Sequence, residues 1–385
     1  MKILFVTHEC SRTGAPIVLL NLIKWLITEK KINAEILFKE TGDLLKDFEE
    51  ITKSQYYYHN PAIHIPKVFR IILFPLGKWR IKLYRYLLLL RLRRKKFDLI
   101  YVNSASSSKI LNSLKKYIDV PYIFHIHELS SGIKYSNINK EFDLALKNSD
   151  IIFPVSYQVE KLLIDSFFVP IEKVKVIYEF IDDINIQSEN KKILKEDEYK
   201  YGEFIVGGSG TINLRKGTDL FIAVGLKLFK NVGIKIPISF VWVGGDPKSI
   251  EFFYFKKDIE NLNLESKIFI IPAVENPFPY YNSFDMFLMT SREDPFPLVC
   301  LENAQLGKPI LYFKGATGVS EFLEKSDFCE VEYLNIDQMA SKILKLYEDK
   351  ELYNRISKYV KSESLQFRTE ILGNEIFKVI KELVK

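Results

Sequence analysis

Short apolar runs alternate along the chain with longer stretches in which apolar residues recur every three or four positions. In the first half, short and mainly apolar runs occupy residues 2–6, 34–38, 99–103, 122–127 and 150–156. Residues 15–28 and 107–118 lie between such runs and have helical spacing. Buried strands that alternate with helices predict a parallel sheet with helices on both faces.

The alternation stops in a polar, highly charged segment at 183–203, which predicts a linker, and then it resumes. Later apolar runs occupy residues 204–210, 238–246, 267–273, 284–291 and 309–313. The tail is helical and charged. We therefore expect an α/β protein with two Rossmann-like domains, 1–185 and 186–360, facing across a cleft that would hold a ligand. A C-terminal helix within 361–385 is expected to pack back on the first domain.

Composition supports a globular protein of this size. The chain has 385 residues, of which 47% are hydrophobic and 27% charged. Its three cysteines (Cys10, Cys300 and Cys329) form no C-x-x-C pair, which argues against a disulfide framework or a thiolate zinc site. The N-terminal apolar run is too short for a signal peptide, and no run approaches the roughly 20 residues that span a bilayer. We expect a cytoplasmic protein, or one attached to the membrane from that side.

Two carboxylates flank a proline-rich segment at 291–310. Asp294 follows a predicted strand, and Glu302 lies a little over one turn into a helix that should begin near Pro297. The backbone amides of the two residues after Pro297 would point out of the helix N-terminus, which favours a phosphate group. Alternatively, Asp294 only complements the helix dipole and Glu302 is solvated.

A glycine-rich turn precedes two cations at 207–221. Arg215 and Lys216 follow this turn and could neutralise a diphosphate. The segment is not the dinucleotide-binding fingerprint, because Asn213 stands where a glycine or alanine is needed, and it is not a P-loop. A plain turn with solvated cations fits the same residues.

The first strand is also followed by a glycine turn. Gly14 separates that strand from its helix, and Pro16 stands at an expected first helical position. Backbone amides here could face the cleft, although an ordinary tight turn explains the residues equally well.

A pair of histidines ends the predicted strand at 122–127. His125 and His127 lie on the same side of the strand, and either could hydrogen-bond a sugar hydroxyl or a phosphate. The spacing also suits a metal, but no third ligand is evident nearby, so we expect no metal site.

Together these segments resemble one family, the retaining glycosyltransferases of family 4 with the GT-B fold (glycosyl transferases group 1). The C-terminal signature of that family is matched by Ser291, Asp294, Phe296, Leu298, Glu302, Ala304, Gly307 and Pro309. The turn at 208–217 resembles the family's phosphate loop, and the segments around Gly14 and His127 resemble its N-terminal motifs. The resemblance covers essentially the whole chain, and the order and spacing of the motifs make it specific.

The resemblance implies a role for each residue. Glu302 would hold the ribose hydroxyls of a nucleotide-sugar, and Asp294 would contact hydroxyls of the transferred sugar. Arg215 and Lys216 would bind the diphosphate and stabilise the leaving group. His127 would approach the sugar from the other domain, so the implied catalytic residues are His127, Arg215, Lys216 and Asp294.

Backbone amides near Gly14 and Leu298 would meet the phosphates. The full donor-binding set implied is Gly14, Gly210, Arg215, Lys216, Asp294, Phe296, Pro297, Leu298, Val299 and Glu302. Retaining enzymes of this fold are thought to use a front-face route, and the sequence contains no D-x-D motif. The resemblance therefore implies a metal-independent site without a cofactor.

The sequence departs from the family pattern at four positions. Asp294 replaces the usual Glu, Pro297 replaces a Gly, and Glu128 replaces the usual Asp. The family's arginine before the loop lysine is Thr211 here, so Arg215 must substitute for it. These changes leave the identity of the donor open.

Positive charge collects in the segment 67–96, which contains eleven Lys or Arg residues and no acid. Aromatic and aliphatic residues are interleaved with the cations, a composition that suits a helix in an anionic lipid interface. The residues predicted to contact the membrane are Lys67, Arg70, Lys78, Trp79, Arg80, Lys82, Arg85, Arg91, Arg93, Arg94, Lys95 and Lys96. Nucleic acid is the rival polyanion, and a surface helix with a core-facing apolar side fits as well.

The resemblance thus implies a retaining glycosyltransferase that moves a sugar from a UDP- or GDP-linked donor to a glycan acceptor, in surface polysaccharide or glycolipid synthesis. A lipid-linked acceptor and a position on the cytoplasmic face of the membrane are expected, and nucleic acid is not expected as a partner. Two alternatives remain at this point: a sugar-nucleotide 2-epimerase, and a non-catalytic nucleotide-sugar-binding protein.

Overall fold

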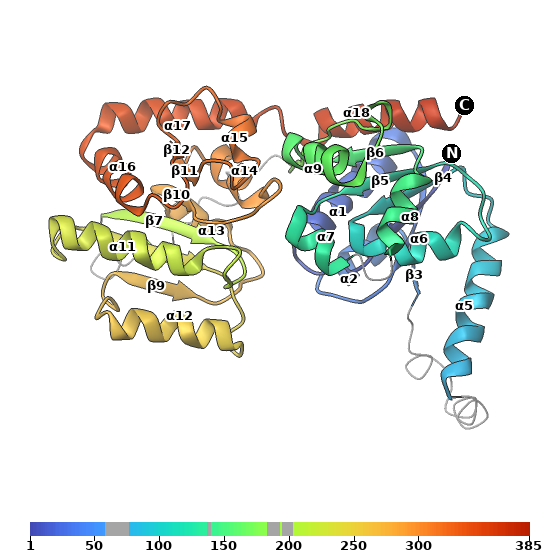
Figure 1. Cartoon of the computed structure of the whole chain (residues 1–385), viewed down its shortest axis with the longest axis horizontal. Coiled ribbons are helices and arrows are strands. Elements are labelled where there is room, and N and C mark those ends of the chain that lie inside the picture. The colour runs from blue at the N-terminus through green and yellow to red at the C-terminus, as the bar shows by residue number, and fades with distance from the viewer. Residues whose placement is uncertain (58–76, 137–139, 183–192, 195–202) are drawn as a thin grey trace. The chain divides into compact units, whose positions relative to one another are not determined.

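The chain folds into two compact units (Figure 1). The computed structural model describes residues 1–57, 77–136, 140–182, 193–194 and 203–385. The first unit comprises Met1–Tyr178 and Thr369–Lys385, and the second comprises Glu179–Arg368. The predicted linker at 183–203 lies almost wholly outside the described residues.

The first unit is built on a parallel sheet of six strands in the order β3-β2-β1-β4-β5-β6. The strands are β1 (Lys2–Thr7), β2 (Asn33–Phe38), β3 (Lys53–Tyr56), β4 (Leu99–Asn103), β5 (Tyr122–Ile126) and β6 (Ile151–Pro154). The four central strands are buried along almost their whole length, as expected for a sheet that is covered on both faces.

Helices connect these strands. They are α1 (Gly14–Lys30), α2 (Leu45–Ile51), α5 (Gly77–Arg93), α6 (Ser108–Leu114), α7 (Ser130–Ser136), α8 (Glu141–Lys147) and α9 (Tyr157–Phe167). The chain also returns to this unit at its end, where α18 (Thr369–Leu383) packs along α1 (Figure 1). Gly373 allows that approach, because a side chain there would come within 2.9 Å of the Trp25 ring.

The second unit repeats the architecture, with strand order β12-β11-β10-β7-β8-β9. Its strands are β7 (Phe204–Ser209), β8 (Ile238–Val243), β9 (Ile268–Ile271), β10 (Met286–Met289), β11 (Ile310–Phe313) and β12 (Glu330–Val331). Its helices are α11 (Thr218–Val232), α12 (Ile250–Asn261), α13 (Phe278–Ser283), α14 (Leu298–Gln305), α15 (Val319–Phe322), α16 (Ile336–Glu348) and α17 (Lys350–Ser364). The predicted α/β class with two Rossmann-like sheets is confirmed.

The strand orders locate the candidate site. In the first sheet the chain turns from β1 to β2 on one side and crosses to β4 on the other; in the second it turns from β7 to β8 and crosses to β10. Open α/β sheets bind ligands beyond the carboxyl ends of the strands at such switch points. A ligand is therefore expected to bind at the segments that follow β1, β4, β7 and β10.

Candidate functional site

The glycine-rich loop of the second unit follows β7 and is shaped by two glycines. Gly210 and Gly217 have φ values of 136° and 66°, which glycine adopts without strain. A side chain at Gly217 would also come within 1.9 Å of the Thr290 carbonyl oxygen. The loop can therefore lie directly against the end of β10, and this holds the residues between the two glycines at the switch point.

Both predicted cations of this loop converge on one carboxylate. The Lys216 ammonium lies 2.6 Å from Asp294 Oδ2, and Arg215 Nη1 lies 3.5 Å from the same oxygen. Arg215 also donates a 2.9 Å hydrogen bond to the Glu293 carbonyl oxygen. Lys216 and Asp294 are largely buried, whereas Arg215 is more exposed. The arrangement offers two fixed positive charges to an anionic ligand, with an acid beside them.

Arg292 also binds the loop and the first turn of α11. Its guanidinium donates two hydrogen bonds to the Asp219 carboxylate, at 2.8 and 2.7 Å, and one to the Leu214 carbonyl oxygen at 2.8 Å. Burial alone would raise the pKa of Asp219, but the contact with Arg292 outweighs it and lowers that pKa. Sequence reasoning missed this residue, and the only signal was that it stands two positions before Asp294.

The helix α14, which follows β10, begins near Pro297 as the sequence predicts. Pro297 is the N-cap in extended conformation, and α14 starts at Leu298. The amide of Cys300 donates a 3.0 Å hydrogen bond to the Pro297 carbonyl oxygen, whereas the amides of Leu298 and Val299 precede the first bonds within the helix. The Phe296 ring is buried and packs 5.2 Å from the Phe367 ring, so its side chain anchors the loop in the core.

Glu302 occupies the second turn of α14. The side chain is half-buried, and burial of its carboxyl group raises the pKa to about 7. Glu302 acts in turn on Tyr281, whose pKa is raised first by burial and then by this carboxylate. Tyr281 is a hydrogen-bond partner of Ser209 at the end of β7, at 2.7 Å. Glu302 therefore lies near the ends of β7 and α14, at the same switch point as the cations.

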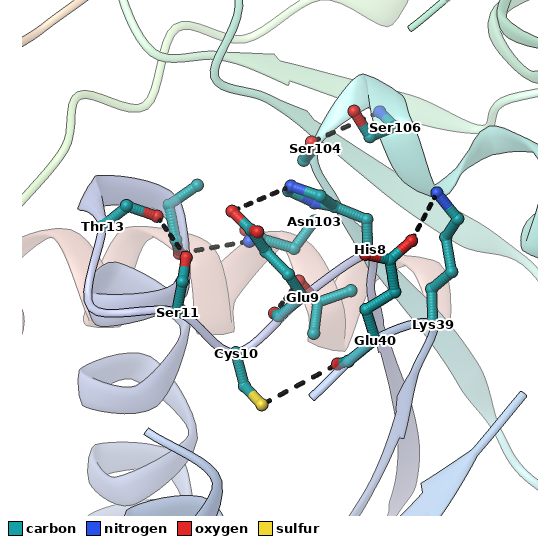
Figure 2. A network of polar contacts seen from close by, with 12 residues as sticks. His8, Glu9, Cys10, Ser11, Thr13, Lys39, Glu40, Asn103, Ser104 and Ser106 are labelled. Atoms are coloured by element: carbon teal, nitrogen blue, oxygen red, sulfur yellow. Dashed lines mark hydrogen bonds and ion pairs between the residues drawn. The ribbon is translucent and has the colours of Figure 1, made fainter. Parts of the chain in front are cut away.

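In the first unit, the loop between β1 and α1 is held by a network of polar contacts (Figure 2). His8 Nε2 lies 3.2 Å from Glu9 Oε1, and Ser11 and Thr13 share a 3.0 Å hydrogen bond between their hydroxyls. The hydrogen bond from His8 lowers the pKa of Glu9. Gly14 is the first residue of α1.

Pro16, which the sequence placed at the first helical position, is the third residue of α1. The helix N-terminus and its free amides lie at the carboxyl end of β1.

The two histidines of the first unit have different surroundings. His125 is fully buried, and its Nδ1 lies 2.7 Å from the Tyr101 hydroxyl. Burial lowers the pKa of His125 well below its ordinary value, so its ring is neutral. His127 follows β5, and its Nε2 lies 2.8 Å from Asn103 Oδ1. Among the residues that the structure describes, no three side chains of His, Cys, Asp or Glu gather as a metal site.

Glu128, the residue that departs from the family's Asp, reaches back to the end of β4. Its carboxylate accepts hydrogen bonds from the Ala105 amide at 3.1 and 3.0 Å and from the His127 amide at 3.0 Å. The Ser104 hydroxyl also donates to it. The carboxylate therefore ties the main chain of His127 to the turn after β4.

The described part of the basic segment is the helix α5 and the three residues after it. Lys67 and Arg70 lie outside the described residues, and the side chains of Lys78 and Arg80 are not described either. Trp79, Leu83, Tyr86 and Leu87 are exposed although they are large and apolar. These four residues recur at helical spacing, so they form one outward stripe.

Most of the described cations of the basic segment are exposed, and Lys95 is an exception. Lys82, Arg91, Arg93, Arg94 and Lys96 are exposed, and Arg85 lies over the Tyr57 ring at 5.1 Å. The Lys95 ammonium instead pairs with the buried carboxylate of Glu35, so the structure places this residue with the core and not with the stripe. No helix in the described ranges has both the length and the apolarity needed to cross a bilayer.

Comparison with known proteins gives a consistent result. The model of Glycosyltransferase Family 4 matches residues 12–184, and that of Glycosyl transferases group 1 matches residues 189–363. An O-antigen biosynthesis glycosyltransferase, WclY from Escherichia coli, is 25% identical over 333 residues, which cover 81% of this chain and 79% of that protein. The N-acetyl-alpha-D-glucosaminyl L-malate synthase of Bacillus anthracis is 20% identical and covers 72% and 73%.

Solved structures agree on the fold. Anabaena HepE in complex with UDP and glucose superposes with a TM-score of 0.80 at 19% identity, over the full length of both chains. TarM superposes with a TM-score of 0.75 at 14% identity, over 98% of both chains. At these identities the structural likeness carries the fold alone, and the two matched family models carry the class of activity.

Proposed function

Because the chain is a glycosyltransferase with the GT-B fold, we propose that it transfers a sugar from a UDP- or GDP-linked donor to a glycan acceptor with retention of configuration at the sugar. The observation that carries this proposal is the meeting of Lys216, Arg215 and Asp294 beside the N-terminus of α14. The alternatives of a 2-epimerase and of a non-catalytic binding protein are not favoured, because the named relatives are glycosyltransferases and synthases.

The proposed chemistry follows from the charges. Breaking the bond between a sugar and a diphosphate develops negative charge on the leaving phosphate. Fixed cations and oriented amides stabilise that charge without reorganising during the reaction. Lys216 and Arg215 would leave Asp294 for the diphosphate, and Asp294 would then accept hydrogen bonds from hydroxyls of the transferred sugar. Glu302 would accept hydrogen bonds from the ribose.

The experiment that tests the donor is a panel of nucleotide-sugars measured for thermal stabilisation. A ligand that binds only the folded protein raises its melting temperature in a concentration-dependent way. We expect one UDP- or GDP-sugar to stabilise the protein most, and that donor to give a glycan product of retained anomeric configuration by NMR. An inverted product would contradict retention, and the absence of stabilisation by the whole panel would contradict the donor class.

Transfer is expected to continue after metal removal. Two side-chain cations already stand where the diphosphate charge would develop, so we propose that no bound ion is required. The transfer rate in an excess of EDTA, which removes weakly bound metal ions, should equal the rate in buffer alone. A loss of rate in EDTA that Mg²⁺ or Mn²⁺ restores would contradict this expectation.

We further propose that α5 binds an anionic membrane at the cytoplasmic face, where a lipid-linked acceptor would be presented. The exposed stripe supplies Trp79 and Leu83 for the interface, and the neighbouring cations supply attraction to acidic headgroups. We infer a lipid-linked acceptor from this exposed surface of α5.

The four exposed cations at the end of α5 give a test. Replacing Arg91, Arg93, Arg94 and Lys96 with Ser removes about 1 kcal/mol of attraction per charge, so binding to phosphatidylserine vesicles should fall by about a thousandfold. A matched control replaces four exposed lysines of the second unit, Lys235, Lys248, Lys256 and Lys257, and should bind as the wild type does. Equal loss in both variants would mean that only net charge matters and would contradict a specific role for α5.

A further inference from the structure

Asn103 connects the end of β4 with the first turn of α1 and with the residue that follows β5. It is the last residue of β4 and is fully buried. Its Nδ2 donates a 3.1 Å hydrogen bond to the Ala15 carbonyl oxygen in the first turn of α1. Its Oδ1 lies 2.8 Å from Nε2 of His127, just after β5. Figure 2 draws Asn103 within the same polar network as the loop between β1 and α1.

The contact with Ala15 fixes which way the amide of Asn103 points. A carbonyl oxygen can only accept a hydrogen bond, so the NH₂ group must face Ala15. The amide oxygen must then face His127, and this oxygen is also only an acceptor. Nε2 of His127 therefore carries a hydrogen, and in the neutral form of the ring the lone pair is at Nδ1.

The main chain of His127 is restrained as well. Ser104 has a φ of 77°, an unfavourable value for a residue other than glycine. The Glu128 carboxylate holds this conformation through the Ser104 hydroxyl and the Ala105 amide, and it also accepts from the His127 amide. The position of the histidine and its ring are thus set by two separate contacts to the end of β4.

We propose that Asn103 is a positioning residue for His127, which it holds in the tautomer protonated at Nε2. The tautomer assignment stands by itself, and what it means for substrate binding rests on the proposed function. Any hydrogen bond that the neutral ring makes through Nδ1 is one that it accepts. A sugar hydroxyl can donate such a bond, whereas an ionised phosphate oxygen cannot. In this tautomer Nδ1 of His127 suits a hydroxyl of a carbohydrate and does not suit an ionised diphosphate.

The tautomer is measured directly by two-bond ¹H–¹⁵N correlation spectra of the ¹⁵N-histidine-labelled protein, at a pH where His127 is neutral. His127→Gln identifies the signal among the five histidines. We expect the wild type to show one tautomer, protonated at Nε2. Asn103→Leu, which keeps the side-chain shape but removes the acceptor, should give a mixture or the other tautomer. Asn103→Asp keeps an acceptor and should retain the wild-type pattern.

Asn112→Ala is the matched control. Asn112 lies on α6 in the same unit and donates through its amide to Glu141, without contacting His127. Its spectrum should equal that of the wild type. A wild-type ring protonated at Nδ1, or an Asn103→Leu spectrum identical to the wild type, would overturn the proposal.

Activity separates positioning from a merely structural role. In Asn103→Leu we expect kcat to fall by about tenfold to a hundredfold, while UDP affinity measured by calorimetry stays unchanged. A fall in kcat with an unaltered tautomer would assign Asn103 to folding alone and contradict the proposal. If the tautomer is as expected but no nucleotide-sugar is turned over by the wild type, the proposed function fails and the assignment of Asn103 stands.

Discussion

Lys216→Met is expected to lower kcat for sugar transfer by about a hundredfold to a thousandfold, the usual effect of removing one preorganised charge from a transition state. The Lys216 ammonium lies 2.6 Å from Asp294, within a loop whose glycines place it at the end of β10. Methionine preserves the unbranched shape of the side chain and removes only the ammonium group. The measurement is kcat under saturating donor, together with the melting temperature.

A second substitution separates lost chemistry from lost stability. Without Lys216, the cation left beside the largely buried Asp294, among the described residues, is Arg215 at 3.5 Å, and an underpaired buried charge destabilises a protein. Adding Asp294→Asn should recover the melting temperature but not the rate. A double variant with nearly normal activity would show that Lys216 serves stability alone.

Lys227→Met is the matched control for this prediction. Lys227 also pairs with an aspartate in the second unit, Asp337 at 2.5 Å, but it lies within α11 and faces α16. Its removal should leave kcat unchanged. If Lys216→Met behaves like Lys227→Met, the loop cations have no special role and the site assignment is wrong.

Glu302→Ala is expected to abolish measurable transfer while the fold is retained. Two hydrogen bonds from ribose hydroxyls to a carboxylate together contribute roughly 3 to 5 kcal/mol, so nucleotide affinity should fall by about a hundredfold or more. Calorimetry with UDP and GDP measures this loss. Near-normal affinity and rate in the variant would remove Glu302 from the donor site.

The pKa of Glu302 adds a dependence on pH that the variant Glu302→Gln isolates. Burial raises this pKa from 4.5 to about 7, so the free protein holds the carboxyl group partly protonated at neutral pH. The ionised form is the better acceptor for two hydroxyls, and nucleotide affinity should therefore rise as pH increases from 6 to 8. Glu302→Gln should show only the ionisation of the nucleotide itself. Parallel curves for the two proteins would contradict this role.

The raised pKa of Glu302 also makes the stability of the folded protein depend on pH. Because the folded-state pKa lies above the unfolded value, Glu302 favours the folded state most below pH 4.5, and this contribution is lost as pH rises through about 7. Stability and nucleotide binding should thus respond to Glu302 in opposite directions over the same interval of pH.

Most of the fold could be predicted from the sequence because its strands are short, mainly apolar runs. The runs at 2–6 and 204–210 correspond to β1 and β7, and both lie at the centre of their sheets. The two-residue strand β12 could not be predicted, since Glu330 and Val331 carry no periodic pattern. The start of α14 could be predicted near Pro297, because proline is accepted at the beginning of a helix.

The site was less completely predictable. Almost 80 residues separate Asp294 from Arg215 and Lys216, and only the matching family motifs suggested that the three meet. Contacts made through side chains with no motif of their own, such as Arg292 with Asp219, left no trace in the sequence. Lys95 looked like one more cation in a basic run, because the sequence does not show that Glu35 on β2 is its partner.

A crystal of the protein soaked with UDP and, separately, with GDP tests the central claim most directly. We expect one of them to bind with its diphosphate beside Lys216 and the N-terminus of α14, and with its ribose hydroxyls on Glu302. A nucleotide bound well away from both residues would contradict the account.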